Sequence, residues 1–288
     1  MGAISRYIAR RYLVHASREN IEQFPQLACY SFDLITNIIV LDGQYERDQL
    51  EFLAKKVFPA LDASATCLDV GGNIGNHSVF FANHFKKVIT LEPHPRNFAL
   101  LSVNADLAPN VLPLPIGASN AASTVRIVED KMNLAASSMH RSEGRAGNVV
   151  EFEVVKIDDM REVQDAGVIA FMKLDIEGHE AAALEGAEDT IARHKPVIML
   201  EVLKDEISGG SSQSLNVLRS MGYAHFYEPV EAGWLGTIPR RLKKLVRAVN
   251  EIVLGRRVSK AERLVKIDTL EDRNYLMILC CADEPEFL

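Results

Sequence analysis

The spacing of apolar residues divides the chain into two parts. Over the first sixty residues, two groups of apolar side chains recur at helical spacing: Ile4, Tyr7, Ile8 and Tyr12, then Leu50, Leu53, Ala54 and Val57. Residues three or four positions apart share one face of a helix. We therefore predict a helical N-terminal extension over residues 1–60.

From residue 66, short β-rich runs alternate with helical runs, and each is bounded by Gly, Pro or Asn. In chain order the first of these runs are TCLDV, NHSVFFANHF, KVITLEP, PRNFALLSVNADL and VLPLPIGAS. Alternation of this kind is typical of crossover units that build a parallel sheet. We expect residues 61–288 to form one α/β domain with helices on both faces of the sheet.

The second half of the chain continues this pattern with one interruption. STVRIVED and VVEFEVVKIDD are separated by the polar stretch SSMHRSEGRAGN, which suits an exposed loop near the sheet edge. The runs FMKLDIEGHE and PVIMLEV have the pattern of buried strands, and the helical AAALEGAEDTIARH lies between them. The apolar NYLMILCCA is predicted to close the sheet.

Composition narrows the class of protein. The chain has 288 residues, of which 48% are hydrophobic and 25% charged, as expected for a globular enzyme. Its apolar runs are too short to cross a bilayer, and its N-terminus carries arginines where a signal peptide needs an apolar centre. The four cysteines have no metal-binding spacing and read as buried thiols of a reducing compartment. These features predict a soluble, cytoplasmic protein.

Charge is distributed unevenly along the chain. The formal net charge is -7, yet residues 239–266 hold ten Lys or Arg and two Glu. Apolar residues between 238 and 253 fall on one helical face, which predicts an amphipathic helix in a basic insertion at about 232–270. The helix would cover the sheet with a solvated basic face, bind an acidic substrate, or contact an anionic membrane peripherally through residues 238–266 at its inner face. Nucleic acid is disfavoured, because the rest of the chain is acidic.

The stretch CLDVGGNIGNHSVFF, residues 67–81, is a glycine-rich turn between a strand and a helix. A dinucleotide fingerprint begun at Gly71 would need glycine at positions 73 and 76, where this chain has asparagine. The stretch instead fits D-x-G-x-G-x-G with Asn73, which tolerates a left-handed backbone, as the middle residue. Asp69, two residues before the first glycine, would repel a pyrophosphate and attract a cation. This favours the ammonium and sulfonium of S-adenosylmethionine.

Glu92 supports the same ligand. It ends the next strand, 17 residues after Gly75. In a doubly wound sheet this position carries a carboxylate that accepts hydrogen bonds from ribose hydroxyls.

Ligands of an open parallel sheet bind beyond the carboxyl ends of the strands. The polar candidates there are Asp175, Glu177, His179, Glu180 and Glu201. Transfer of a methyl group to a hydroxyl needs a base, and His179 is the side chain most easily tuned for that role near neutral pH. Helix capping is the alternative for Glu177, His179 and Glu180. Such side chains also bind divalent metals, but no spacing here is diagnostic of a metal site.

Five blocks in order resemble the FkbM-type S-adenosylmethionine-dependent methyltransferases. They are CLDVGGNIGNHSVFF, VITLEPHPRNFALLSVN, VVKIDDM, MKLDIEGHEAAALEGA and PVIMLEV, and GQYE at residues 43–46 matches a further short element. The resemblance implies a Rossmann-like class I methyltransferase fold, with a seven-stranded, mostly parallel sheet, and O-methylation of sugars or glycans.

The resemblance also implies a cofactor site. It places Asp69, Gly71, Asn73 and Gly75 around the methionine end of S-adenosylmethionine, Glu92 on the ribose, and Tyr45 and Glu46 at the same site. Many methyltransferases carry an aspartate after the third strand that reads the adenine amine, but this chain has Ala118. Adenine would then be contacted through the backbone or neighbouring side chains.

Our hypothesis is an S-adenosylmethionine-dependent methyltransferase that acts on a hydroxyl of a sugar, glycan or glycan precursor. The catalytic residues that we predict for it are Asp175, Glu177, His179 and Glu201. Two alternatives stay open. One is a catalytically inert Rossmann-like module that binds a partner or an anionic surface through the basic helix. The other is an NAD-dependent oxidoreductase, which Asn73 and Asn76 disfavour.

Overall fold

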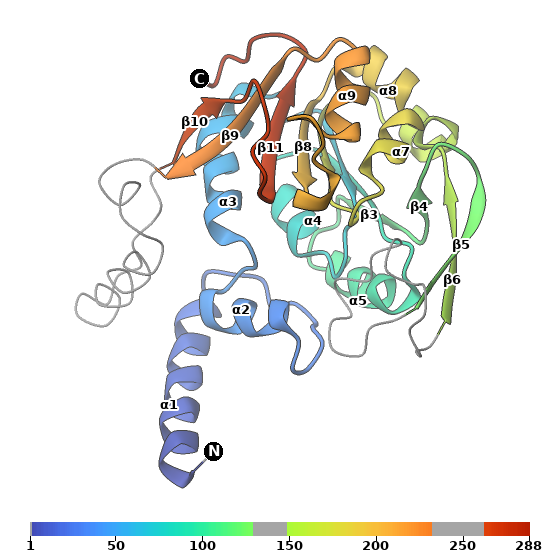
Figure 1. Ribbon diagram of the computed structural model, residues 1–288. Helices are drawn as coiled ribbons and strands as arrows, with labels where there is room; N and C mark the ends of the chain where they lie inside the picture. Colours follow the sequence, from blue (N-terminus) through green and yellow to red (C-terminus); the bar gives the residue numbers. More distant parts are fainter. Residues whose placement is uncertain (1, 129–148, 232–261) are drawn as a thin grey trace.

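A computed structural model describes residues 2–128, 149–231 and 262–288 of the chain. Its centre is an eight-stranded sheet with the strand order β10-β9-β11-β8-β7-β1-β2-β3 (Figure 1). These strands are β1 Thr66–Val70, β2 Lys87–Leu91, β3 Val111–Leu114, β7 Ile169–Leu174, β8 Val197–Val202, β9 His225–Glu231, β10 Glu262–Lys266 and β11 Tyr275–Cys281.

The parallel part of the sheet brings five strand ends to one edge. β3, β2, β1, β7 and β8 pair in parallel, whereas β11 is antiparallel to both β8 and β9. Asp69 on β1 lies between Thr90 on β2 and Lys173 on β7 in the register. Polar side chains at the carboxyl ends of these strands therefore meet, although they are far apart in the sequence.

Two hydrophobic cores lie against the sheet, because successive residues of a strand point to opposite faces. Leu68 and Met172 belong to one core with residues of α7 and α9, and Cys67 and Phe171 belong to the other with residues of α3 and α4. The helices are α1 Ala3–Asn20, α2 Leu34–Asp42, α3 Arg47–Phe52, α4 Asn76–Phe81, α5 Pro95–Ala105, α6 Arg161–Gln164, α7 Glu180–Glu185, α8 Glu188–His194 and α9 Gln213–Ser220. The predicted arrangement of helices on both faces is confirmed.

The helical N-terminal extension is not uniform. α3 and the π-helical turn Leu53–Val57 pack in the second core, where Leu50, Leu53 and Val57 are fully buried. α1 projects from the body, with the N-terminus at its far end (Figure 1). α3 and the turn after it are thus part of the domain core, whereas α1 is not.

The predicted count of seven strands is wrong, although the fold class holds. β10 adds an eighth strand, because it pairs antiparallel with β9 over five residues. A separate three-stranded sheet has the order β4-β6-β5 and consists of β4 Gly117–Ala118, β5 Ser123–Val128 and β6 Val149–Val155. The strand β10 occupies the end of the predicted basic insertion. The amphipathic helix predicted between 238 and 253 and the loop SSMHRSEGRAGN lie outside the described residues.

In the part of the chain that the structure describes, no helix combines the length and apolar character needed to cross a bilayer. All four cysteines are free thiols, and Cys67, Cys280 and Cys281 are buried.

Candidate active site

A cavity of about 240 Å³ lies at the carboxyl edge of the parallel strands. Its walls come from the N-terminal extension, the glycine-rich turn, the ends of β2, β7 and β8, and the small second sheet. The lining residues are Leu34, Ile35, Tyr45, Glu46, Val70, Gly71, Asn73, Leu91, Glu92, Pro93, His94, Asn97, Gly117, Ala118, Ile127, Phe152, Asp175, Ile176, Glu177, Glu201 and Leu276.

The glycine-rich turn wraps over the end of β2. Gly71, Asn73 and Gly75 all have positive φ, at 87°, 50° and 89°, so the predicted left-handed backbone at Asn73 is confirmed. The Gly71 and Gly72 N–H groups both donate to the Leu91 carbonyl, at 3.0 and 2.9 Å. A Cβ at Gly71 would lie 2.0 Å from the carbonyl oxygen of Asp175, so only glycine fits where β1 passes β7.

Glu92 is fixed by the turn and by its own strand end. Its Oε2 accepts a hydrogen bond from the Asn73 N–H at 2.9 Å, and its Oε1 accepts one from the His94 N–H at 2.8 Å. Burial raises the pKa of Glu92 to about 7, although these two N–H groups oppose the shift. Asn97 also hydrogen-bonds this carboxylate, and the residue lines the cavity. Because a carboxylate has about four lone-pair sites, Glu92 can accept a further hydroxyl donor of a ligand.

Lys173 connects the strand ends from behind the cavity. Its Nζ lies 3.3 Å from Asp69 Oδ1 and 3.2 Å from Asp175 Oδ2, and it donates to the Gly71 carbonyl at 3.2 Å. Burial alone would lower the pKa of Lys173, but Asp175 and Asp69 outweigh burial and raise it. The ammonium therefore stays charged and holds β1, the glycine-rich turn and β7 together.

Asp175 and Glu201 form a pair of carboxyl groups whose pKa values are shifted in opposite directions. Burial would raise the pKa of Asp175, but Lys173 and His77 lower it overall. Burial and the neighbouring charge of Asp175 raise the pKa of Glu201 to about 9. At neutral pH the pair thus consists of a carboxylate and a carboxylic acid that hydrogen-bond to each other. The Asp175 side chain is 36% exposed and faces the cavity, so it can accept a proton from a ligand.

Backbone strain gathers at the same cavity. Five non-glycine residues of the described chain have positive φ, and three of them line the cavity: Glu46, Asn73 and Glu177. Such conformations persist where the surrounding structure imposes them, which is common at functional sites. His77 Nε2 lies 3.2 Å from Glu46 Oε2 and so fixes this carboxylate on the cavity wall.

Three buried asparagines fasten the N-terminal extension to the glycine-rich turn, α4 and α5. Asn76, the first residue of α4, accepts from the Tyr45 N–H and donates to the Tyr45 carbonyl, both at 3.1 Å. Asn104 on α5 makes the same pair of bonds with Ala28, at 2.6 and 3.0 Å, and also donates to the Ile74 carbonyl of the turn.

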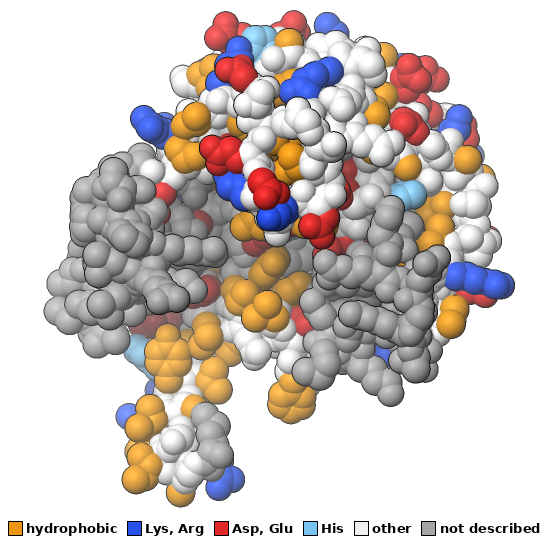
Figure 2. Space-filling view, viewed as in Figure 1, with side chains coloured by type: hydrophobic (Ala, Val, Ile, Leu, Met, Phe, Trp, Pro, Cys, Tyr) orange, Lys and Arg blue, Asp and Glu red, His pale blue; other side chains and the backbone are white. Residues whose placement is uncertain are grey.

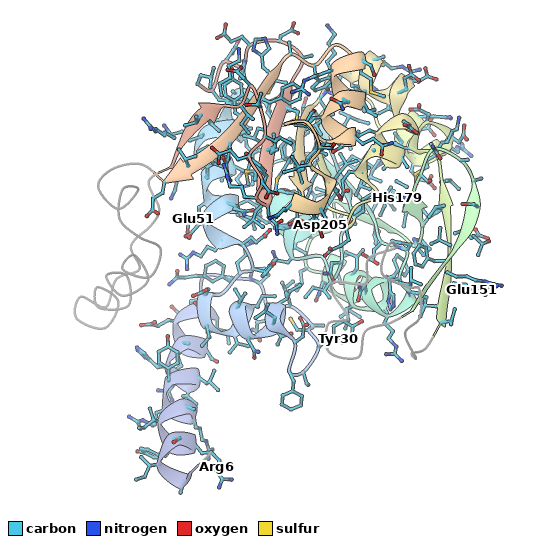
Figure 3. All side chains as sticks on the ribbon, in the orientation of Figure 1. Arg6, Tyr30, Glu51, Glu151, His179 and Asp205 are labelled. Atoms are coloured by element: carbon cyan, nitrogen blue, oxygen red, sulfur yellow. The ribbon has the colours of Figure 1, made fainter. Side chains whose placement is uncertain are left out.

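Asn97 makes the third of these links. It accepts from the hydroxyl of Tyr30 at 3.1 Å and hydrogen-bonds Glu92. Figure 3 labels Tyr30 on the loop of the N-terminal extension that precedes α2. Together the three asparagines hold residues 28–46 as one wall of the cavity.

Most of the predicted site residues meet at this cavity. Gly71, Asn73, Glu92, Tyr45 and Glu46 line it, and so do the catalytic candidates Asp175, Glu177 and Glu201. Three predicted residues lie elsewhere: Asp69, Gly75 and His179.

Each of the three displaced residues has another environment. Asp69 is fully buried behind the turn, where Ser78 Oγ donates to it at 2.6 Å and Lys173 neutralises it. The ring of His179 is 2.9 Å from Ser119 Oγ, at the N-cap position of α7. The charge of Asp69 therefore acts through Lys173, not directly on a ligand. Gly75 begins α4 as its N-cap.

Sequence reasoning missed four residues of the site. Lys173 lies in an apolar strand, two residues before Asp175. A lysine within a run of buried residues could have indicated a buried ion pair. Asn76 and Asn104 gave no signal, because polar residues on helices are ordinarily solvated. Phe152 lies on the second sheet, in a strand whose position beside the cavity depends on tertiary packing.

The sheet order, the glycine-rich turn and the acidic cavity define a Rossmann-like domain of the class I methyltransferase type. A sequence model of the methyltransferase FkbM domain matches residues 69–226, and the chain belongs to this family. A search among curated proteins gave no match.

Several solved structures resemble the chain. An FkbM methyltransferase from Methylobacillus flagellatus is 18% identical, with a TM-score of 0.35 over 65% of this chain and 48% of that one, so the match spans about half of its length. An rRNA methylase from Streptococcus thermophilus is 12% identical, with a TM-score of 0.39 over 82% and 95%. Fibrillarin from Aeropyrum pernix, with natively bound S-adenosyl-L-methionine, is 8% identical, with a TM-score of 0.38 over 77% and 68%.

Replacing Lys173 by Met should destabilise the protein by about 3–5 kcal/mol, because Asp69 and Asp175 would lose their shared cation. Urea unfolding of the variant measures this loss. Lys55→Met serves as a control, since its ion pair with Glu51 is exposed and should contribute about 0.5 kcal/mol. Asp69→Asn should recover part of the loss in the Lys173→Met background. A Lys173→Met variant as stable as the wild type would contradict the central role of this ammonium.

Asn104→Ala should release the N-terminal segment. The variant leaves the backbone groups of Ala28 without their partners, so protease cleavage within residues 21–46 should become faster by about tenfold. Asn110→Ala is the matched control, because Asn110 also donates to two carbonyls, those of Ala82 and Phe85, away from the extension. Limited proteolysis with mass spectrometry compares the two. Equal cleavage of both variants in this segment would show that Asn104 has no special role in holding it.

Proposed function

We propose that the protein is an S-adenosylmethionine-dependent methyltransferase that methylates a hydroxyl of a sugar, glycan or glycan precursor. The single observation that carries the proposal is one cavity that combines a fixed hydroxyl acceptor, Glu92, with an ionised and partly exposed carboxylate, Asp175. The family match supports methyl transfer, and the sugar acceptor follows from the family resemblance.

The residues of the cavity suit the methyl donor. Glu92 would accept a ribose hydroxyl, and the apolar wall of Ala118, Ile127 and Phe152 would pack against the adenine ring. Asn73 and Gly71 would contact the methionine end. Among the described residues, those that line the cavity include no lysine or arginine, which favours a cationic ligand over a pyrophosphate. When bound, S-adenosylmethionine supplies a methyl group activated by its sulfonium.

Asp175 is the best-placed base. Lys173 holds it ionised, and the protonated Glu201 beside it is oriented by the hydrogen bond between them. As an acceptor hydroxyl forms its new bond to carbon, its proton would pass to the Asp175 carboxylate. His179 is less suited, because its ring contacts Ser119 and it does not line the cavity. Glu46 and Glu177 would accept further hydroxyls of a sugar.

Binding of S-adenosylhomocysteine should depend on the ionisation of Glu92. Because its pKa is raised to about 7, the affinity should fall about tenfold for each pH unit below that value, as the carboxylate is protonated. Raising the pH through 7 should instead lower the folding stability, since burial disfavours the charged form. Isothermal titration between pH 5.5 and about 8.5 measures the affinity. Glu92→Gln should bind weakly with a flat pH profile, and a wild-type profile in this variant would exclude the assignment.

Asp175→Asn should abolish methyl transfer while preserving cofactor binding. The amide keeps the shape but cannot accept the proton, so turnover should fall by about 10²–10⁴-fold, with the affinity for S-adenosylhomocysteine within about threefold of the wild type. Labelled S-adenosylmethionine incubated with glycan extracts measures the transfer and seeks the acceptor. Glu153→Gln, on the exposed side of β6, is the matched control. Undiminished turnover in Asp175→Asn would remove this residue from the mechanism.

A further inference from the structure

α1 differs from the other helices in how little of it is packed. Ala16 is the buried residue among its 18, and Asn20 holds its end by donating to the carbonyls of Val40 and Leu41, at 3.2 and 3.3 Å. Most helical stability in proteins comes from tertiary packing of one face of the helix. The projecting part of α1 therefore lacks the surface that would ordinarily stabilise it.

The first three turns of α1 carry an exposed apolar face. Ile4, Tyr7, Ile8 and Tyr12 are spaced by three and four residues, so they lie on one side of the helix. They are 78%, 65%, 62% and 57% exposed. Figure 2 shows apolar side chains gathered over α1 on the face in view. Large apolar side chains that cluster in solvent mark an interaction surface.

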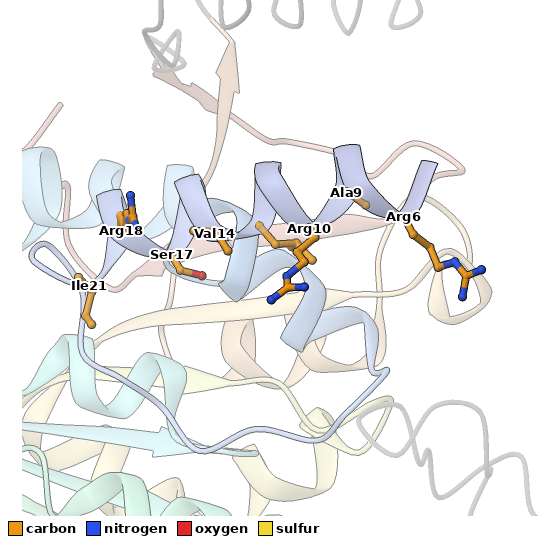
Figure 4. Close-up of a pocket in the computed structure, with 8 residues that line it drawn as sticks. Arg6, Ala9, Arg10, Val14, Ser17, Arg18 and Ile21 are labelled. Atoms are coloured by element: carbon orange, nitrogen blue, oxygen red, sulfur yellow. The ribbon is translucent and has the colours of Figure 1, made fainter. Parts of the chain in front are cut away.

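The charges beside this face are basic. Arg6 and Arg10 lie on the other side of the helix, whereas Arg11, four residues after Tyr7 and three after Ile8, lies on the apolar face itself. Figure 4 shows Arg6, Arg10 and Arg18 along α1, around a shallow depression that is also lined by Leu13, Val14 and Ile21. The single acidic residue of the helix is Glu19, near its C-terminal end, where His15 Nε2 lies 3.3 Å away. The projecting half of α1 is thus both apolar and cationic.

We propose that α1 docks on the surface of an anionic lipid bilayer, with Ile4, Tyr7, Ile8 and Tyr12 inserted at the headgroup boundary. Helices that lie in a membrane interface combine an apolar face with Lys or Arg on the other side, and tyrosine is enriched at that depth. The arginines complement lipid phosphates, and the long Arg11 side chain can extend toward them from within the apolar face. Two copies of α1 packed through this face would bring like-charged Arg11 side chains together. A second copy of the chain therefore fits this face less well than an anionic bilayer does.

This docking surface does not depend on the proposed methyl transfer, because none of its residues lines the cavity. It is also distinct from the membrane contact predicted from the sequence, which involves residues 238–266. Substitutions within α1 alone distinguish the two surfaces by experiment, because they leave residues 238–266 unchanged.

Flotation of the full chain with lipid vesicles tests the proposal. The protein should float with vesicles of phosphatidylcholine and phosphatidylglycerol, should not float with phosphatidylcholine alone, and should be released by high salt. Ile4→Gln/Ile8→Gln should weaken binding by at least about tenfold. Arg6→Gln/Arg10→Gln/Arg11→Gln should weaken it by about a hundredfold. Glutamine keeps the helix propensity of the replaced residues comparable, so α1 should remain helical by circular dichroism.

Val168→Gln is the control, since Val168 is an exposed apolar residue, at 56%, outside the helix. It should float like the wild type. Three results would overturn the proposal. One is a wild-type protein that does not bind anionic vesicles, and the second is α1 variants that bind as well as the wild type. The third is a dimer in size-exclusion chromatography that Ile4→Gln/Ile8→Gln dissociates in the absence of lipid binding.

Discussion

The buried ammonium of Lys173 is the interaction on which the site depends. One side chain reaches Asp69 on β1, the Gly71 carbonyl in the turn, and Asp175 at the end of β7. Removing a charge from water is unfavourable unless partners surround it, so this arrangement keeps the three elements in one geometry. It also divides the acidic residues by role. Asp69 balances the charge of the lysine in the protein interior, whereas Asp175 stays ionised and faces the cavity.

The N-terminal extension completes what the sheet begins. A parallel sheet offers a crevice at its carboxyl edge, but the crevice needs a further wall to enclose a ligand. Here residues 28–46 supply that wall, and Asn76, Asn97 and Asn104 attach it to the turn and to α5. Asn76 begins α4 directly after the turn, and Asn97 of α5 hydrogen-bonds Glu92. The position of the extension is therefore coupled to the shape of the ligand site.

Local patterns in the sequence predicted the elements and the strand-end residues, because periodicity and turn chemistry act over a few residues. Asn73, Glu92, Asp175 and Glu201, which line the cavity, were predicted in this way. The ion pair of Asp69 with Lys173 was not, since its partners are 104 positions apart and a charged residue inside a strand contradicts the apolar pattern. For His179 the sequence left a base and a helix-start role open, because a helix start can aim a side chain at either the cavity or a neighbouring group; in the structure its ring lies beside Ser119. The eighth strand was not predicted, because β10 follows a basic segment whose apolar residues have helical spacing.

The central claim is that this acidic cavity holds S-adenosylmethionine. A crystal structure of the protein soaked with S-adenosylhomocysteine tests it most directly. The account predicts a ribose hydroxyl on the Glu92 carboxylate, the adenine against Phe152, and the sulfur on the side of Asp175. Clear density for the ligand at another surface, or an empty cavity at saturating ligand, would contradict it.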